Sequence, residues 1–307
     1  LQRRLVKRLR TGGMAERDID DVVHGRGERP PVNWMILGGG LLFAVVSIAL
    51  GMSSLKYKQE IIFAASMGIV LFLMLRLVRE LTPAARNTLV GTALLIFVFR
   101  AMPGPGAGAT WWMIDVLGFD EAFLSKLSLI GAALALFGMF AFRRFMAERS
   151  IAYIVGFLTI IGGLLSLPSF AMYHGLHVWT AAHTGGVVDA RFIAMVDTAL
   201  ESPLGQISMI PMLAWIANSA PERLKATYFA VMASFTNLAL SLAQLGTKYL
   251  NGAYKVTREV KDAATGAIQV PADYSQLGDL FLAAILIGVL LPMTAILIVR
   301  STRLGSA

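Results

Sequence analysis

The sequence predicts an all-α membrane protein with eight transmembrane helices. Three observations lead to this prediction. Of the 307 residues, 56% are hydrophobic and only 15% are charged, and the mean hydropathy is +0.67. Apolar runs of membrane-spanning length recur along the chain, and basic residues concentrate in every second connection. A soluble chain of this length would carry more charge and would lack such runs, so a multi-pass membrane protein is expected.

Eight stretches are each long enough to cross, as a helix, a hydrocarbon core of about 30 Å. They are expected at residues 33–55, 59–75, 87–110, 127–142, 150–173, 192–217, 226–249 and 280–299. The connections at 76–86, 143–149 and 223–225 are basic, whereas those at 103–126, 173–191 and 250–279 are longer and mixed in charge. Because basic loops remain in the cytoplasm, both ends of the chain are expected there.

Residues 1–32 precede the first predicted helix and are interpreted as a cytoplasmic basic loop. Eight of the 27 basic residues lie in the first 29 positions, and the net charge of +8 is therefore no sign of a nucleic-acid partner. The segment RRLVKRLR could alternatively lie on anionic lipid as a basic amphipathic helix. The chain contains no cysteine and opens on Leu1 without a signal-peptide pattern, so a segment of a longer protein is expected.

Two neighbouring predicted helices, 192–217 and 226–249, carry polar residues at membrane depth. On the first, Asp197 and Glu201 lie one turn apart and Gln206 follows. On the second, polar residues follow one another at spacings of three and four: Ser234, Asn237, Ser241, Gln244 and Lys248. Such side chains usually face a bundle interior or a watery cavity, so the two helices predict a pathway or a binding site. Lys248, near the helix end, is expected to extend its amine to the membrane interface.

Arg100 is the charged residue within the third predicted helix, and Pro103, Gly104, Pro105 and Gly106 come soon after it. Prolines remove backbone donors and glycines add conformational freedom, so the helix is expected to unwind there. Broken helices at membrane depth commonly line binding sites or gates. The planar guanidinium suits a carboxylate ligand, and the alternative is an internal ion pair that only holds helices together.

The remaining polar residues each have two interpretations. Asp197 and Glu201 share a helix face, an arrangement that suits proton uptake and release as well as a structural role. The amides of Gln206, Asn237 and Gln244 could bind a ligand or join helices.

Three loop histidines lack acidic or cysteine partners, so no metal site is predicted: His174, His177 and His183. No nucleotide loop, hydrolase motif or cofactor fingerprint is present, so neither an enzyme nor a cofactor is expected.

Several segments together resemble the folate–biopterin transporter family. They are FRAMPGPG followed by WWMIDVLGFDEAF, then RRFMAERSIAYIVGF, DTALESPLGQISMIPMLAWIANSAPERLKATYFAVMASFTNLALS and LGTKYLN. That family belongs to the major facilitator superfamily, in which twelve helices form two six-helix halves around a central cavity. The resemblance implies that residues 33–82 are two helices of the N-terminal half and that 83–307 form the C-terminal six-helix half-bundle. Four leading helices would then be missing from this chain or supplied by a partner chain.

The resemblance also implies a function: secondary transport of a small organic anion, folate- or pterin-like, by alternating access that protons could drive. The expected substrate-binding residues are Arg100, Gln206, Asn237 and Gln244. Glu201 and Asp197 are expected to couple protons, with Glu201 paired to Arg100 in the empty carrier, and residues 103–106 are expected to form a gate. Membrane lipid and the anionic substrate are the expected partners, in a bacterial inner membrane. A non-transporting membrane scaffold or assembly factor that keeps the fold is the alternative. A pore is a further one, which the buried charges and broken helix disfavour.

Overall fold

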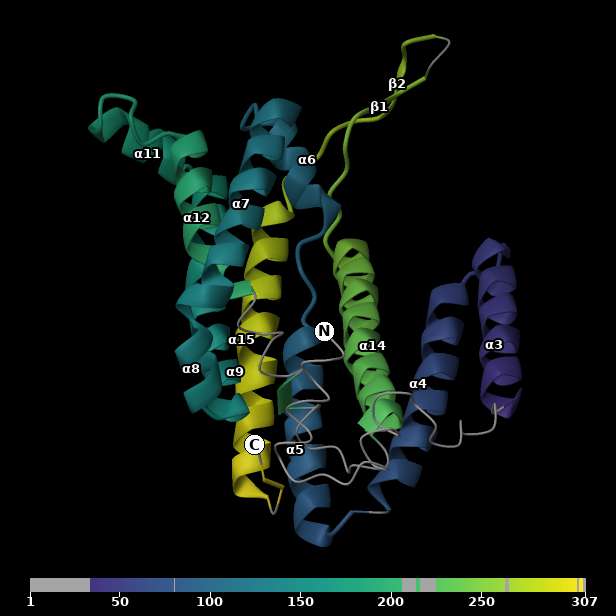
Figure 1. Cartoon of the computed structure of the whole chain (residues 1–307). Helices are drawn as coiled ribbons and strands as arrows, with labels where there is room; N and C mark the ends of the chain where they lie inside the picture. Colours follow the sequence, from purple (N-terminus) through teal and green to yellow (C-terminus); the bar gives the residue numbers. More distant parts are fainter. Residues whose placement is uncertain are drawn as a thin grey trace, which may run out of the picture. The chain divides into compact units, whose positions relative to one another are not determined.

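The structure is a computed structural model of the chain, and it describes residues 34–79, 81–205, 214–215, 225–262, 265–302 and 304–305 (Figure 1). The basic loop predicted at residues 1–32 lies outside these ranges. The chain divides into two compact units, residues 1–58 and residues 59–307, and each is described by itself. Helices dominate the described part of both units, as the sequence predicts.

The first unit contains the helix α3 (Trp34–Met52), which occupies the first predicted span. Lys58 closes the turn after this helix, because its Nζ donates to the carbonyl oxygens of Gly51 at 2.7 Å and Ser53 at 2.9 Å. A lysine at this position satisfies carbonyls that the helix itself leaves open and complements the helix dipole.

The second unit contains the other described helices and one β-hairpin. In chain order they are α4 (Lys58–Val78), α5 (Pro83–Arg100), α6 (Ala107–Asp115), α7 (Glu121–Ala141), α8 (Arg143–Glu148), α9 (Ile151–Leu165), α10 (Leu167–Tyr173), α11 (Leu176–His183), α12 (Ala190–Gly205), α14 (Lys225–Ala253), β1 (Val260–Lys261), β2 (Ile268–Val270) and α15 (Leu277–Ser301).

Five segments of the described chain are long and apolar enough to cross a membrane: Lys58–Arg76, Glu121–Ala141, Ile151–Tyr173, Tyr228–Ala253 and Leu277–Ser301. These spans agree with a multi-pass membrane protein, and the number of eight stays a prediction. The third predicted span is divided into α5 and α6. The sixth is described only as far as α12, apart from residues 214–215.

Local capping residues set two helix starts that the hydropathy pattern placed later. α5 begins at Pro83, where Thr82 Oγ1 accepts the backbone N–H of Ala85 at 3.4 Å and proline occupies the first helical position. α7 begins at Glu121 because Asp120 Oδ1 accepts the N–H of Phe123 at 2.7 Å. The caps extend both helices beyond their apolar stretches, into the polar connections.

α5 lies at the centre of the larger hydrophobic core of the second unit. Its side chains Leu89, Ala93, Leu95 and Ile96 are buried against apolar side chains of α4, α9, α14 and α15. Figure 1 shows α5 between α15 and α14, and both helices contact it. Among lipid tails such packing stabilises mainly through van der Waals contact, so close fit matters more than apolar character.

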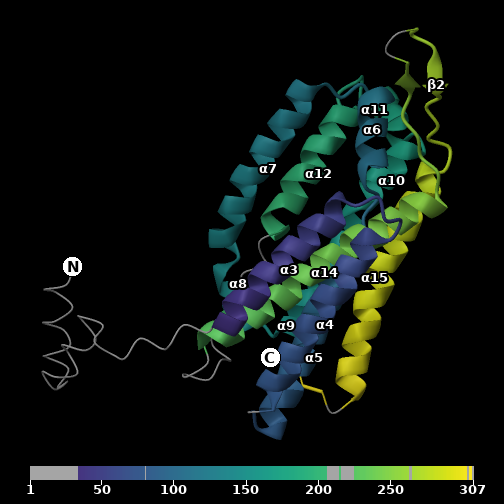
Figure 2. The same cartoon turned by 90° about the vertical axis from the view of Figure 1, so that its right-hand side faces the viewer.

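A second contact joins α7 to α12, which run side by side (Figure 2). Small residues allow the backbones of α7 and α12 to approach each other closely. A Cβ atom at Gly131 would lie 3.0 Å from Ser202 Oγ, and one at Gly138 would overlap the backbone of Pro203. This is the close packing of small residues that membrane helices favour.

The connection between α14 and α15, predicted as a loop, contains a short hairpin, and the described part of the chain is otherwise helical. β1 and β2 pair antiparallel, with Val260 opposite Val270. The base of the hairpin is fixed by Tyr173, whose hydroxyl donates to the carbonyls of Tyr274 at 3.0 Å and Ser275 at 2.9 Å. We call the end of the second unit that carries α6, the hairpin and the starts of α7 and α12 the hairpin end.

Candidate functional site

The helix break predicted after Arg100 is present. α5 ends at Arg100, residues 101–106 are not helical, and α6 begins at Ala107. Gly106 has φ +70° and ψ −158°, a backbone conformation that is essentially restricted to glycine. Pro103 and Pro105 carry no backbone donor, so the break leaves fewer N–H groups without a partner. Local sequence therefore explains why the chain unwinds here.

The last turns of α14 hold this break in place. Thr247 Oγ1 accepts the backbone N–H of Gly104 at 3.1 Å. Asn251 Nδ2 donates to the carbonyl of Pro105 at 3.3 Å and to that of Thr247 at 2.8 Å. Thr247 and Asn251 were not among the site residues expected from the sequence. The available signal was their spacing of four, which places two polar side chains on one helix face beside the predicted one.

Arg100 lies at the edge of the break with its side chain half-buried. Its Nε atom is buried and has no hydrogen-bond partner among the residues that the structure describes. A buried donor without a partner costs about 1–3 kcal/mol, and the guanidinium keeps its charge at physiological pH. A charged group with an unsatisfied donor at a helix break is well placed to bind an anion.

The ion pair expected between Arg100 and Glu201 is not formed. Within the described part of the chain, no salt bridge joins Arg100 to Glu201 or to Asp197. Helix packing gives the reason. α5 packs on α9, α14 and α15, whereas α12, which carries both carboxylates, packs mainly on α7.

The two carboxylates of α12 have different surroundings. Asp197 is half-buried, and its Oδ1 is buried without a partner among the described residues, whereas Glu201 is exposed. The carboxylate of Asp197 is thus partly buried, and that of Glu201, one turn away, is exposed. Gln206, expected to bind substrate from the same helix, lies outside the described residues.

The polar face predicted on α14 lies partly on a cavity. This cavity, of about 520 Å³, is formed between α4 and α14 and is lined by Gln59, Ile62, Phe63, Ser66, Leu238, Ser241, Gln244, Leu245 and Lys248. Gln244, an expected substrate-binding residue, therefore lines a space that a small molecule could enter. Asn237 is exposed on α14 and is not among the lining residues.

An ion pair closes the contact between α4 and α14. Lys248 Nζ lies 2.6 Å from Glu60 Oε1, and the hydroxyl of Tyr249 donates to the same oxygen at 2.8 Å. The other oxygen, Glu60 Oε2, is buried with no partner among the described residues. Lys248, which was expected to extend its amine to the membrane interface, is 43% exposed and also pairs with Glu60, a partner that was not predicted. Glu60 was missed, although an acidic residue at the start of an apolar span could have drawn attention.

At the hairpin end, Asp115 ties the hairpin to α6. Arg258 donates to its carboxylate through Nε at 3.2 Å and Nη2 at 3.0 Å, and the Tyr274 hydroxyl donates at 2.5 Å. The hydrogen bond from Tyr274, followed by that from Arg258, lowers the pKa of Asp115. Burial, followed by the hydrogen bond to Asp115, raises the pKa of Tyr274 to about 12. Both groups therefore keep fixed protonation states near neutral pH, which indicates a structural role.

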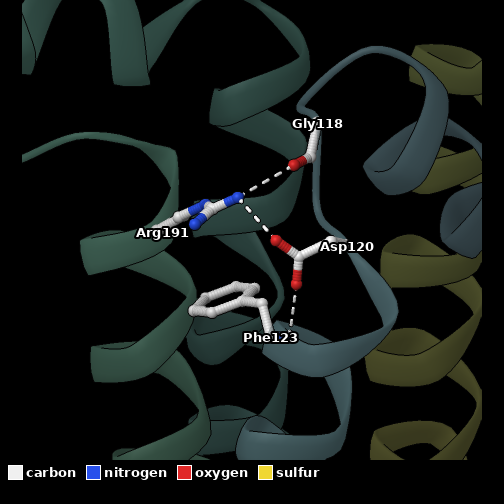
Figure 3. A network of polar contacts seen from close by, with 4 residues as sticks. All are labelled: Gly118, Asp120, Phe123 and Arg191. Carbon is white, nitrogen blue, oxygen red and sulfur yellow. Dashed lines mark hydrogen bonds and ion pairs between the residues drawn. The ribbon is translucent and has the colours of Figure 1, made fainter.

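A second network at the hairpin end joins the starts of α7 and α12 (Figure 3). Arg191 Nη2 donates to the carbonyl of Gly118 at 3.1 Å and to Asp120 Oδ2 at 3.2 Å. The guanidinium also lies 5.3 Å from the ring centroid of Phe123. The backbone N–H of Phe123 is the main cause of a lowered pKa at Asp120. Arg191 thus fixes α12 to the capping residue of α7.

The three loop histidines make local contacts. His177 Nδ1 lies 3.0 Å from the carbonyl oxygen of Met172, His183 Nδ1 lies 2.8 Å from that of Trp179, and the ring of His174 packs on Phe170. Over the residues that the structure describes, no group of three or more His, Cys, Asp or Glu side chains could hold a metal ion.

Comparison with known proteins places these features in a family. The model of the BT1 family matches residues 41–304. A "Folate-biopterin transporter" of Synechocystis sp. (strain ATCC 27184 / PCC 6803 / Kazusa) is 27% identical over 154 residues, which cover 50% of this chain and 30% of that protein. A "Putative folate transporter 2" of Plasmodium berghei (strain Anka) is 24% identical over 161 residues, or 52% of this chain and 34% of that protein.

The aligned part of the chain spans only about a third of the length of each of these relatives. No solved structure gives a significant match. The family model, in contrast, covers most of the sequence, including the helix break, α12 and the cavity between α4 and α14. The chain therefore belongs to the BT1 family, the folate–biopterin transporter family that its motifs resemble, and it is a multi-pass membrane protein of a transporter family, which is not a family of enzymes.

Proposed function

We propose that this protein is a secondary transporter that moves a small organic anion, of the folate or pterin class, across a membrane by alternating access. Membership of the BT1 family and the names of both relatives support the transport role and the substrate class. In this proposal Arg100, Gln206, Asn237 and Gln244 bind the substrate, and residues 103–106 form a gate.

The observation that carries the proposal is the buried Nε of Arg100 at the helix break, which has no hydrogen-bond partner among the described residues. A charge at membrane depth needs compensation, and within the described residues no carboxylate supplies it by an ion pair. An anionic substrate would supply it. Because Thr247 ties the break to α14, binding at Arg100 can be transmitted to the helix that also carries Gln244.

We assign proton coupling to the carboxylates of Asp197 and Glu201. Asp197 has a sheltered oxygen without a partner among the described residues, and Glu201 lies one turn away in an exposed position. A proton taken up at the exposed group can reach the sheltered one along this helix face. In this proposal the two carboxylates act without an ion pair to Arg100, in contrast to the Arg100–Glu201 pair expected from the sequence.

We further propose that the protein lies in a bacterial inner membrane with both chain ends in the cytoplasm. Arg143 and Arg144 of α8, together with Arg149, are exposed at the connection between α7 and α9, and basic loops remain on the cytoplasmic side. The hairpin end would then face away from the cytoplasm.

Labelled folate binding and uptake by membrane vesicles that contain the complete protein test the function. Arg100→Gln should weaken folate binding by about 10- to 100-fold, because hydrogen bonds to charged groups contribute about 1.5–3 kcal/mol. Arg100→Lys should fall between this variant and the wild type, since an ammonium lacks the planar fork. Arg300→Gln is the matched control, because Arg300 is exposed in the last turn of α15.

Two results would contradict the proposal. Unchanged folate binding in Arg100→Gln would remove Arg100 from the site. A wild-type protein that is inserted and folded but takes up neither folate nor biopterin would favour the membrane scaffold or assembly factor.

A further inference from the structure

We propose that the cavity between α4 and α14 is an anion subsite, in which Lys248 binds a carboxylate of the substrate and Glu60 is the resident counter-ion that this carboxylate displaces. The inference rests on the proposed function, because it names where the acidic end of the transported molecule binds. It adds two residues, Glu60 and Lys248, to those expected from the sequence.

The lining of the cavity fits an amphipathic anion. Its volume of about 520 Å³ is in the range of small-molecule sites. Lys248 supplies the cation, and the amides and hydroxyls of Gln59, Ser66, Ser241 and Gln244 supply hydrogen-bonding groups. Phe63 and the aliphatic side chains around it form an apolar wall. Such a surface can hold a molecule with a flat apolar body and a carboxylate at one end.

In the ion pair of the cavity wall, only one of the two Glu60 carboxylate oxygens accepts hydrogen bonds from other side chains. Glu60 Oε1 accepts hydrogen bonds from Lys248 and Tyr249, while Oε2 is buried without a partner among the described residues. A carboxylate oxygen buried in this way loses hydration and gains nothing in return. A substrate carboxylate that replaced Glu60 could accept hydrogen bonds from the same two donors.

The pair is also within reach from outside. Of the side-chain surface, 43% is exposed for Lys248 and 22% for Glu60. The exposed part of Lys248 allows a ligand carboxylate to approach its amine from outside. Lys248 follows directly on Thr247, which holds the helix break. Occupation of the subsite therefore acts on the same turn of α14 that positions residues 103–106.

Chemical reactivity of Lys248 tests the subsite without transport. The complete protein in nanodiscs of neutral phosphatidylcholine is treated with an amine-reactive reagent, and modification at Lys248 and Lys255 is measured by peptide mass spectrometry. Folate, which carries carboxylates, should slow the modification of Lys248 severalfold, and biopterin, which carries none, should not. Lys255 is exposed beyond the end of α14, does not line the cavity, and should react equally in all samples.

Variants of Lys248 and Glu60 distinguish a ligand site from a structural ion pair by whether they strengthen or weaken folate binding. Lys248→Gln should weaken folate binding about tenfold or more, and Lys248→Arg should largely keep it. Glu60→Gln removes the competing carboxylate and should strengthen binding. If the pair only held α4 against α14, Glu60→Gln and Lys248→Gln would weaken binding alike, and that result would overturn the proposal. Lys255→Gln serves as the matched control.

Three further outcomes separate this inference from the proposed function. Folate uptake by the wild type with no protection of Lys248 would overturn the subsite and leave the transport role intact. Protection of Lys248 by folate without uptake would support the subsite and contradict transport. Protection by anionic phosphatidylglycerol in the nanodisc, with none by folate, would assign Lys248 to a lipid headgroup and overturn the subsite.

Discussion

Substitution of Gly106 by alanine tests whether the helix break is held by both its own backbone and α14. The backbone at Gly106, with φ +70° and ψ −158°, is essentially restricted to glycine. A Cβ atom there would lie 2.9 Å from Thr247 Cγ2 and 3.0 Å from Asn251 Nδ2. The substitution therefore combines a conformational cost with a steric one.

The two costs can be estimated separately. Backbone strain of this kind costs about 1–3 kcal/mol, and overpacking against neighbouring atoms adds about 1–3 kcal/mol. Gly106→Ala should therefore lower the free energy of unfolding by roughly 2–6 kcal/mol. Gly104→Ala is the matched control, because Gly104 has no positive φ and a Cβ atom there meets nothing within 4 Å.

The assay is thermal unfolding of the purified protein in detergent, followed by fluorescence-detected size exclusion. Gly106→Ala should lower the melting temperature by several degrees, and Gly104→Ala should change it little. Thr247→Ser removes the nearest methyl group but keeps the oxygen that accepts from Gly104. In the Thr247→Ser background Gly106→Ala should therefore cost less than in the wild type. Equal melting temperatures for Gly106→Ala and Gly104→Ala would refute the reasoning.

Two further predictions concern the hairpin end and the orientation. The lowered pKa of Asp115 in the folded state stabilises the protein at pH values above the ordinary value of 3.8, and this contribution is lost as the pH falls through the folded-state pKa. Asp115→Asn should therefore lower the melting temperature at neutral pH and make its acid dependence shallower; an unchanged acid dependence would contradict the role of Asp115. The chain contains no cysteine, so an introduced cysteine is the only one within these 307 residues. A membrane-impermeant maleimide added to intact cells should label Ala272→Cys near the hairpin and leave Arg144→Cys in α8 unlabelled, and the reverse pattern would overturn the proposed orientation.

Features that depend on a few consecutive residues could be predicted from the sequence. The apolar runs predicted membrane helices, because backbone groups in lipid must be satisfied within a helix. The prolines and glycines at 103–106 predicted the break, because they restrict or release the backbone where they stand. The motifs around 189–251 resembled the family that the comparison confirms.

The contacts between distant segments could not be predicted in the same way. Arg100 and Glu201 both carried charges at membrane depth, and their pairing was a reasonable expectation from charge alone. The structure instead packs α12 on α7 and leaves the guanidinium beside residues that α14 supports. Whether two charges meet depends on which helices are neighbours, and hydropathy contains no such information.

The sequence by itself determined that this protein is a helical membrane protein of its family, with a broken helix after Arg100 and polar faces near positions 197–201 and 234–248. Only the tertiary structure decided what those groups touch. It placed Glu60 against Lys248, Thr247 and Asn251 against the break, and Gln244 on a cavity. Local composition decides where a helix forms and stops, whereas the partner of each buried charge is decided by the packing of whole helices against one another.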